Sequence, residues 1–205
     1  MWVTAAQKKS GDPHRLVLPG GRRVRIRPIR PDDADELQEA FAVLSDAARY
    51  QRFLTGTSSL NDRVARYLVD IDHTNHEALV AMASGSPDIV GVARFIRSGT
   101  TPAEAELAIT VADQWQRAGL GTALLDLLSD RARAEGIRWF TMEMLSDNAG
   151  IRALVQAAGG EIDTSDREVL SGRIDLVPGS RKRAAPARGA RAAPRADRLG
   201  VSVRD

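Results

Sequence analysis

Gln116-Arg117-Ala118-Gly119-Leu120-Gly121-Thr122 is the most informative stretch of this 205-residue sequence. It stands between an apolar run that predicts a strand, Glu106–Val111, and a leucine stripe at helical spacing. The backbone N–H groups of such a loop lie at the positive end of a helix dipole, and its two glycines let a ligand approach the backbone closely. The stretch therefore predicts an anion-binding loop suited to phosphate. The alternative is an ordinary strand-to-helix turn.

Two common phosphate-binding motifs fit this stretch poorly. It lacks the Gly-Lys-Ser/Thr of a nucleoside-triphosphate P-loop. A dinucleotide-binding fold places its glycine loop after the first strand, whereas this loop comes late in the chain. The pyrophosphate of another cofactor fits the position better.

The segments around the loop predict a mixed sheet with helices, an α/β (α+β) fold. Apolar runs or alternation predict strands near 16–18, 24–27, 78–83, 89–96, 106–111, 139–144, 161–164 and 168–176. Start signals predict helices that begin near Pro31, Ser45, Asn61, Leu120 and Asp147 or Asn148. We expect a flexible leader (1–14), a single domain (15–178) and a disordered Arg/Ala/Pro-rich segment (179–205), because that segment has few large apolar residues.

Composition excludes several classes of protein. The sequence has no apolar run long enough to span a membrane and no secretory signal, so we expect a cytoplasmic protein without membrane contact. It has no cysteine, and its histidines (His14, His73, His76) lack metal-ligand spacing, which predicts no metal site.

The charge of the chain is unevenly distributed. Residues 180–205 contain eight Lys or Arg and two Asp, a net charge of +6, while the whole chain carries +2, so the rest carries −4. The part expected to fold therefore gives no electrostatic reason to expect nucleic-acid binding. For the basic segment the alternatives are a solvated extension and a contact with nucleic acid or an acidic partner.

The loop resembles the signature of the GNAT superfamily of N-acetyltransferases, Arg/Gln-x-x-Gly-x-Gly/Ala after the central fourth strand, which Gln116, Gly119 and Gly121 match. The chain looks most like the acetyltransferase domain of bacterial protein-lysine acetyltransferases, through Ile26-Arg27-Pro28-Ile29, Tyr50-Gln51-Arg52-Phe53 and His76-Glu77-Ala78-Leu79-Val80-Ala81. The resemblance implies a mostly antiparallel sheet of about six to seven strands, splayed between the fourth and fifth, here Glu106–Val111 and Trp139–Met144.

The resemblance also implies the reaction and its co-substrate. Acetyl-CoA would lie in the splay, held by Gln116, Arg117, Ala118, Gly119, Leu120, Gly121 and Thr122. The acetyl group would pass to a primary amine, of a protein lysine or a small molecule, by direct attack in a ternary complex. An ammonium group with a pKa of about 10.4 needs a base, for which we predict Glu106, with Glu104 in reserve on the same face of the strand. A solvent-facing strand carboxylate is the alternative for Glu106.

Other parts of the site follow from the resemblance or depart from it. A backbone N–H among Ile109, Thr110 and Val111 would stabilise the thioester oxygen. Asn148 would cap a helix and also contact the cofactor arm. The tyrosine that acts as general acid in many relatives is absent from Leu154–Ala158, and the usual Gly-Phe is replaced by Gly159-Gly160.

Two questions stay open from the sequence. Tyr50, Arg52 and Phe53 either pack in the core or form part of the acceptor site. The chain is either an enzyme, as a monomer or homodimer, or an acetyl-CoA-sensing module that acts through a partner.

Overall fold

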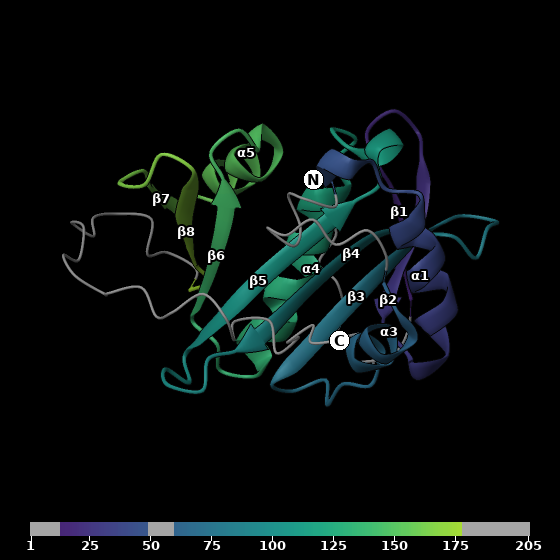
Figure 1. Cartoon of the computed structure of the whole chain (residues 1–205), viewed down its shortest axis with the longest axis horizontal. Helices are drawn as coiled ribbons and strands as arrows, with labels where there is room; N and C mark the ends of the chain where they lie inside the picture. Colours follow the sequence, from purple (N-terminus) through teal and green to yellow (C-terminus); the bar gives the residue numbers. More distant parts are fainter. Residues whose placement is uncertain (1–12, 49–59, 178–205) are drawn as a thin grey trace.

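The computed structural model describes residues 13–48 and 60–177. Eight strands form one sheet in the order β1-β2-β3-β4-β5-β6-β8-β7 (Figure 1). All neighbours are antiparallel except β5 and β6, which are parallel. The strands are β1 His14–Val17, β2 Arg23–Pro28, β3 His76–Ala83, β4 Ile89–Arg97, β5 Glu104–Val111, β6 Trp139–Leu145, β7 Glu161–Asp163 and β8 Val169–Asp175.

The predicted fold class is confirmed, with two differences in detail. The sheet has eight strands instead of about six to seven, because the short strands β1 and β7 extend its two edges. The parallel pair at which the sheet splays is therefore the fifth and sixth strand of the chain. In addition, β5 begins at Glu104, two residues before the predicted start.

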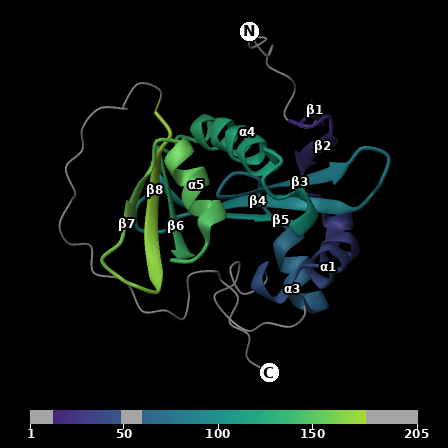
Figure 2. The ribbon, with the colours of Figure 1, turned by 90° about the horizontal axis from the view of Figure 1, so that it is seen from above.

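Helices cover the two faces of the sheet in different regions. Figure 2 shows α4 and α5 on one side and α1 and α3 on the other. The helices are α1 Ala34–Ala42, α3 Asp62–Val69, α4 Leu120–Ala134 and α5 Ala149–Ala157, with 3₁₀ turns at Pro31–Asp33 and Asp113–Trp115. Of the helices described, none has the length and apolar character needed to cross a membrane.

Side-chain caps fix the starts of several helices, as the sequence predicted. The Oδ1 atom of Asn61 accepts a hydrogen bond from Val64 N (2.9 Å) at the start of α3. Ser45 Oγ accepts one from Ala48 N (3.2 Å). Such caps satisfy amide groups that have no acceptor within the helix. Tyr50, Arg52 and Phe53 lie outside the described residues.

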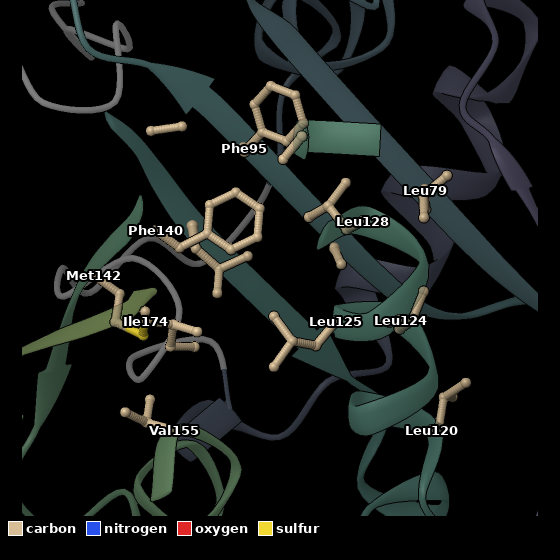
Figure 3. Close-up of a cluster of buried hydrophobic side chains, with 14 of the residues drawn as sticks. Leu79, Phe95, Leu120, Leu124, Leu125, Leu128, Phe140, Met142, Val155 and Ile174 are labelled. Carbon is tan, nitrogen blue, oxygen red and sulfur yellow. The ribbon is translucent and has the colours of Figure 1, made fainter. Parts of the chain in front are cut away.

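The larger core lies between the sheet and α4. Leu120, Leu124 and Leu128 are fully buried on one stripe of the helix, against β3, β4 and β5 (Figure 3). The rings of Phe95 and Phe140 pack beside them with centroids 5.9 Å apart. Burying each leucine contributes about 1.5–3 kcal/mol, so this stripe holds the N-terminus of α4 at the end of β5.

The second core lies under α1 and α3 and is joined to β2 by a buried ion pair. Arg27 Nη1 and Nη2 donate to the two carboxylate oxygens of Asp33 at 2.7 and 2.6 Å. Asp33 also accepts from Arg30 N at 2.7 Å. The pair ties the start of α1 to the sheet at the Ile26-Arg27-Pro28-Ile29 segment.

Candidate active site

The sheet opens between β5 and β6. Their parallel pairing covers only Glu104–Glu106 opposite Trp139–Thr141, whereas β5 stays paired with β4 as far as Val111. Beyond Glu106, the edge of β5 that faces β6 therefore has no strand partner among the described residues. Ile109, Thr110 and Val111 lie on this edge, where peptide groups can bond to a ligand.

The predicted anion-binding loop follows β5 after a short 3₁₀ turn, Asp113–Trp115. Gly119 has φ 83° and Arg117 has φ 56°, so the chain turns sharply before α4 begins at Leu120. The first hydrogen bond of α4 runs from Ala123 N to Gly119 O, at 3.1 Å. The N–H groups of Leu120, Gly121 and Thr122 precede that bond and have no acceptor within the helix. The first turn carries no acidic residue, so an anion meets no repulsion there.

The two glycines have different reasons to be glycine. At Gly119 a Cβ would lie 3.1 Å from Pro19 Cδ, and the left-handed conformation also disfavours a side chain. At Gly121 a Cβ would only make an ordinary contact, 3.8 Å from Leu154 Cδ2. Nothing in the fold requires glycine at Gly121, although it costs about 1 kcal/mol relative to alanine in a helix. The absence of its Cβ instead suits a ligand that approaches the backbone, such as a pyrophosphate.

Several side chains brace the loop from outside. Gln116 Nε2 donates to Val111 O (3.2 Å) and to Asp113 Oδ1 (3.3 Å). The carboxylate of Asp113 also accepts from Ser45 N (3.1 Å) and Ser45 Oγ (3.0 Å), which links the loop to the segment after α1. Gln116 thus stabilises the loop through hydrogen bonds of its neutral amide, one of them to a backbone carbonyl.

The turn between β1 and β2 packs against the same loop. Arg22 donates to Gln114 O, and its guanidinium lies 5.1 Å from the centre of the Trp115 ring. Trp115 in turn packs on the core under α4. These contacts join residues 92 and 93 positions apart, and no local pattern in the sequence signals them.

The two candidate bases lie on the same side of the sheet, away from α4. Glu106 pairs with Ile96 of β4 and Thr141 of β6, and it is partly exposed. Glu104 accepts a hydrogen bond from Arg173 Nη2 at 3.1 Å, beside the Trp139 ring, on which Arg173 stacks at 4.6 Å. The Glu104 carboxylate is thus engaged in an ion pair with a side chain of β8. Glu106 is the last residue of β5 that pairs with β6, so of the two glutamates it lies nearer to the splay.

Asn148 caps α5 at the far side of the splay. Its Oδ1 accepts from Ile151 N at 3.1 Å, which confirms the predicted capping role. The amide NH₂ of the same side chain remains available as a donor to a ligand.

Steric contacts after α5 require glycine at Gly160. A Cβ at Gly160 would lie 2.6 Å from Arg173 O and 2.7 Å from Val155 Cγ1. A side chain at this position therefore has no room in the fold. Val155, in the stretch that lacks the family tyrosine, is fully buried.

An apolar cavity of about 60 Å³ opens on the side of the sheet that carries Glu106. Side chains of α1 and α3 line it with β4 and the end of β5, and its polar lining residues are Arg94 and Thr110. Arg94 is buried and contacts Leu68 O, at 3.4 Å, and His76. Thr110 and Ala112 bring the cavity to the end of β5, beside the splay.

Comparisons with known proteins agree with this geometry. Residues 23–161 match the family described as "Acetyltransferase (GNAT) domain". "Acetyltransferase PA5475" of Pseudomonas aeruginosa is 31% identical over 163 residues, which cover 78% of this chain and 87% of that protein. "Acetyltransferase Pat" of Mycolicibacterium smegmatis is 27% identical over 153 residues, 75% of this chain but only 46% of its own length.

A solved structure is similar as well. The GNAT domain of S. lividans PAT superimposes with a TM-score of 0.73 at 30% identity, covering 80% of this chain and 96% of that domain. The family match, the relatives and the splayed sheet lead to one conclusion: the chain belongs to the GNAT family and is an acetyl-CoA-dependent acetyltransferase.

Proposed function

We propose that the chain transfers the acetyl group of acetyl-CoA to a primary amine, of a protein lysine or a small molecule, with Glu106 as general base. The observation that carries the proposal is the splay, with the anion-binding loop on one side of the sheet and Glu106 on the other. The pantetheine arm of acetyl-CoA, lying in the splay, would carry its thioester to a position between the loop and Glu106. Localisation in the cytoplasm remains part of the proposal.

Different residues of the site bind the cofactor, stabilise the developing charge and accept the proton. The N–H groups of residues 117–122 hold the pyrophosphate, and Asn148 Nδ2 donates to the pantetheine arm. A peptide N–H on the open edge of β5, among Ile109, Thr110 and Val111, stabilises the charge that develops on the thioester oxygen. Glu106 accepts the ammonium proton of the acceptor, directly or through water. The cofactor supplies the activated acetyl group.

Isothermal titration with acetyl-CoA tests the cofactor site. Gly121→Glu places a side chain and a negative charge at the N–H groups of α4, so we expect binding to be lost. Gly99→Glu is the matched control, because a Cβ at Gly99 meets no atom within 4 Å. Equal binding by the two variants would remove the loop from the cofactor site.

Turnover of a small primary amine tests the base. We expect Glu106→Gln to lower kcat by on the order of 10²–10⁴ while the acetyl-CoA Kd is kept. Glu104→Gln, on the same strand and face, is the control and should change kcat less than about tenfold. A full rate in Glu106→Gln would refute the assignment.

The absence of the family tyrosine supports one alternative, a module that binds acetyl-CoA and acts through a partner. Leu154–Ala158 offers no proton donor to the leaving thiolate. A thiol with a pKa of about 8.5 can leave with the help of water, so catalysis does not require the tyrosine. A wild-type chain that binds acetyl-CoA yet acetylates no amine in a broad screen would favour this alternative.

A further inference from the structure

We propose that the apolar cavity beside the end of β5 receives acyl chains longer than acetyl, so that the chain also transfers propionyl and butyryl groups from their CoA thioesters. The proposal rests on the function proposed above and extends it to a class of co-substrate, the short unbranched acyl-CoAs. The lining of the cavity and its position on β5 support it.

The wall of the cavity that lies opposite the sheet is apolar. The lining residues from α1, from α3 and from the segments that adjoin these helices are Leu37, Ala40, Phe41, Leu44, Leu60 and Leu68. The polar lining residues, Arg94 and Thr110, both belong to the sheet. Apolar atoms that face a void lose dispersion contacts, which an apolar ligand restores.

The volume of the cavity, about 60 Å³, limits the length of the chain that fits. An apolar cavity of about 150 Å³ binds benzene, which has about six carbons. In proportion, a cavity of about 60 Å³ holds roughly two to three carbons. Propionyl and butyryl groups exceed acetyl by one and two carbons and therefore fit, whereas an octanoyl group is too long.

The side chains of β5 alternate between the two faces of the sheet. Ile109 and Val111 pack on the core under α4, whereas Thr110 lines the cavity on the side covered by α1 and α3 (Figure 2). Glu106 lies on the same face as Thr110, because the side chains of a strand alternate with a period of two. The cavity and the proposed base therefore share one side of the sheet.

The hydrogen bonds of the sheet identify the peptide groups of β5 that face the splay. Ala112 N donates to Val90 O of β4 at 3.0 Å. In an antiparallel pair, residues that bond to the partner strand alternate with residues that do not. Ile109 and Val111 therefore turn their peptide groups away from β4 and towards the splay. Val111 O accepts from Gln116 Nε2 at 3.2 Å, as this alternation requires.

This arrangement places a bound thioester beside Thr110. An oxygen that accepts from Ile109 N or Val111 N lies about 2.9 Å from that nitrogen. The Cα atom of Thr110 is about 3.8 Å from the Cα atom of each neighbour. In the described part of the chain, no strand separates Thr110 from the splay. An acyl chain that turns from the thioester to the Glu106 side of the sheet therefore passes Thr110 and enters the cavity.

The order of groups along β5 assigns the cavity to the acyl chain and not to the acceptor. Glu106 precedes Ile109 by about 10 Å along the strand. The cavity meets this part of the chain at Thr110 and Ala112, beyond Ile109. An amine that gives its proton to Glu106 therefore approaches from the start of β5, while the acyl chain extends towards its end.

The transfer of a longer acyl group balances as acetyl transfer does. Glu106 takes a proton from the ammonium group of the acceptor, and the neutral amine attacks the thioester carbonyl. A C–N bond forms, the C–S bond breaks, and CoA leaves as a thiolate that takes a proton from solvent. The product is an N-propionyl or N-butyryl amide.

Isothermal titration with acetyl-, propionyl-, butyryl- and octanoyl-CoA tests the cavity without an acceptor. Burial of one methylene group tightens binding by up to about fourfold. We therefore expect the Kd to fall about 3- to 15-fold from acetyl-CoA to butyryl-CoA and to fall no further with octanoyl-CoA. Turnover with one small primary amine should show transfer of the propionyl and butyryl groups as well as of acetyl.

A pair of variants on α1 tests whether the cavity is the cause. Ala40 lines the cavity, so Ala40→Leu fills it from the helix side, and the Kd values of acetyl- and butyryl-CoA should become equal. Ala42→Leu is the matched control, because it makes the same substitution on the exposed side of the same helix. This control should keep the wild-type ratio of the two Kd values.

Two results with the wild-type chain would overturn the proposal, so the test does not depend on the folding of Ala40→Leu. Equal Kd values for acetyl- and butyryl-CoA would mean that the longer chain does not enter the cavity. A Kd that continues to fall through octanoyl-CoA would mean that the chain lies on an open apolar surface.

The remaining outcomes separate this proposal from the function on which it rests. If Ala40→Leu changed the KM of the amine but no acyl-CoA Kd, the cavity would belong to the acceptor and the proposal would fall. Acetyl transfer without propionyl or butyryl transfer would remove the proposal and leave the proposed function standing. A wild-type chain that binds no acetyl-CoA would remove both.

Discussion

Arg94 donates a hydrogen bond to Nε2 of His76, 3.1 Å away, on the side of the sheet that carries Glu106. A guanidinium has no acceptor atom, so Nε2 of His76 must be the unprotonated nitrogen and the imidazole is neutral. Burial of the imidazole, together with the positive charge of Arg94, lowers the pKa of His76 to about 4.

This relationship predicts a loss of stability in mild acid. Unfolded histidine has a pKa of about 6.5, so between pH 6.5 and 4 the unfolded chain binds the proton and the folded chain does not. The free energy of unfolding therefore decreases as the pH is lowered from 6.5 to 4, by up to about 3 kcal/mol in total. Urea unfolding of wild type and His76→Gln at pH 7 and pH 4.5 measures it.

The variant supplies the control for that measurement. His76→Gln removes the titrating group but keeps an acceptor for Arg94, so its stability should change much less between the two pH values. The carboxylate of Asp72 accepts three backbone N–H bonds and a bond from Asn75, which lower its pKa to about 2, although burial opposes this. Its contribution is lost only below about pH 4. Equal pH slopes for variant and wild type would contradict the assignment to His76.

Gly121→Ala should separate the effect of this glycine on stability from its effect on acetyl-CoA binding. Alanine fits the described structure at Gly121 and is favoured in a helix, so we expect the free energy of unfolding to rise by about 0.5–1 kcal/mol. The added methyl group projects where the phosphates approach, so the acetyl-CoA Kd should increase at least about tenfold.

Gly119→Ala is the contrasting variant, because it meets Pro19 and requires a left-handed alanine. It should lower stability by about 1 kcal/mol or more. Thermal unfolding and titration of the two variants provide both values. If Gly121→Ala bound acetyl-CoA as wild type does, the glycine would need another explanation.

Parts of the site that depend on neighbours in sequence could be predicted from it, and parts that depend on distant contacts could not. The caps at Asn61 and Asn148 were predictable because a short polar side chain bonds an amide three residues on. The loop at Gly119 was predictable because few residues tolerate its backbone conformation.

The choice between Glu104 and Glu106 shows the limit of sequence. A period of two places both on one face, and the sequence could not rank them by environment. In the structure Arg173, 69 positions away, pairs with Glu104, and the pairing of β5 with β6 ends at Glu106, beside the splay. The contact of Arg22 with the loop could likewise not be predicted, because it exists only once β1, β2 and the end of β5 have assembled.

Glu77→Gln should weaken the attachment of α4 to the sheet. Glu77 is almost completely buried on β3; its Oε1 accepts from His73 Nδ1 at 2.8 Å and its Oε2 from Arg131 Nε at 2.5 Å. A neutral amide cannot pair with Arg131, and it places an NH₂ where one of these donors now points. We expect the free energy of unfolding to fall by about 3 kcal/mol.

A comparison with an exposed ion pair tests whether burial is the cause. Asp130 pairs with Arg133 on the outer side of the same helix, so Asp130→Asn should cost less than about 1 kcal/mol. Denaturant unfolding of the two variants under one buffer condition gives both numbers. A similar small loss in both would show that Glu77 contributes no more than a surface pair.

Asp33→Asn should destabilise the chain because it leaves a buried arginine without its counter-ion. Burial opposes ionisation of Asp33, but the hydrogen bonds from Arg27 and from Arg30 N hold the pKa of its carboxyl below the ordinary value. Asparagine keeps one acceptor oxygen and turns an NH₂ toward the guanidinium, so we expect the free energy of unfolding to fall by about 3–5 kcal/mol.

The double variant Arg27→Met/Asp33→Leu removes both charges and should recover more than half of that loss, since burying an ion pair gains little over packing apolar groups. Urea unfolding of both variants decides the point: a double variant less stable than Asp33→Asn would mean that the pair is worth more than its desolvation cost.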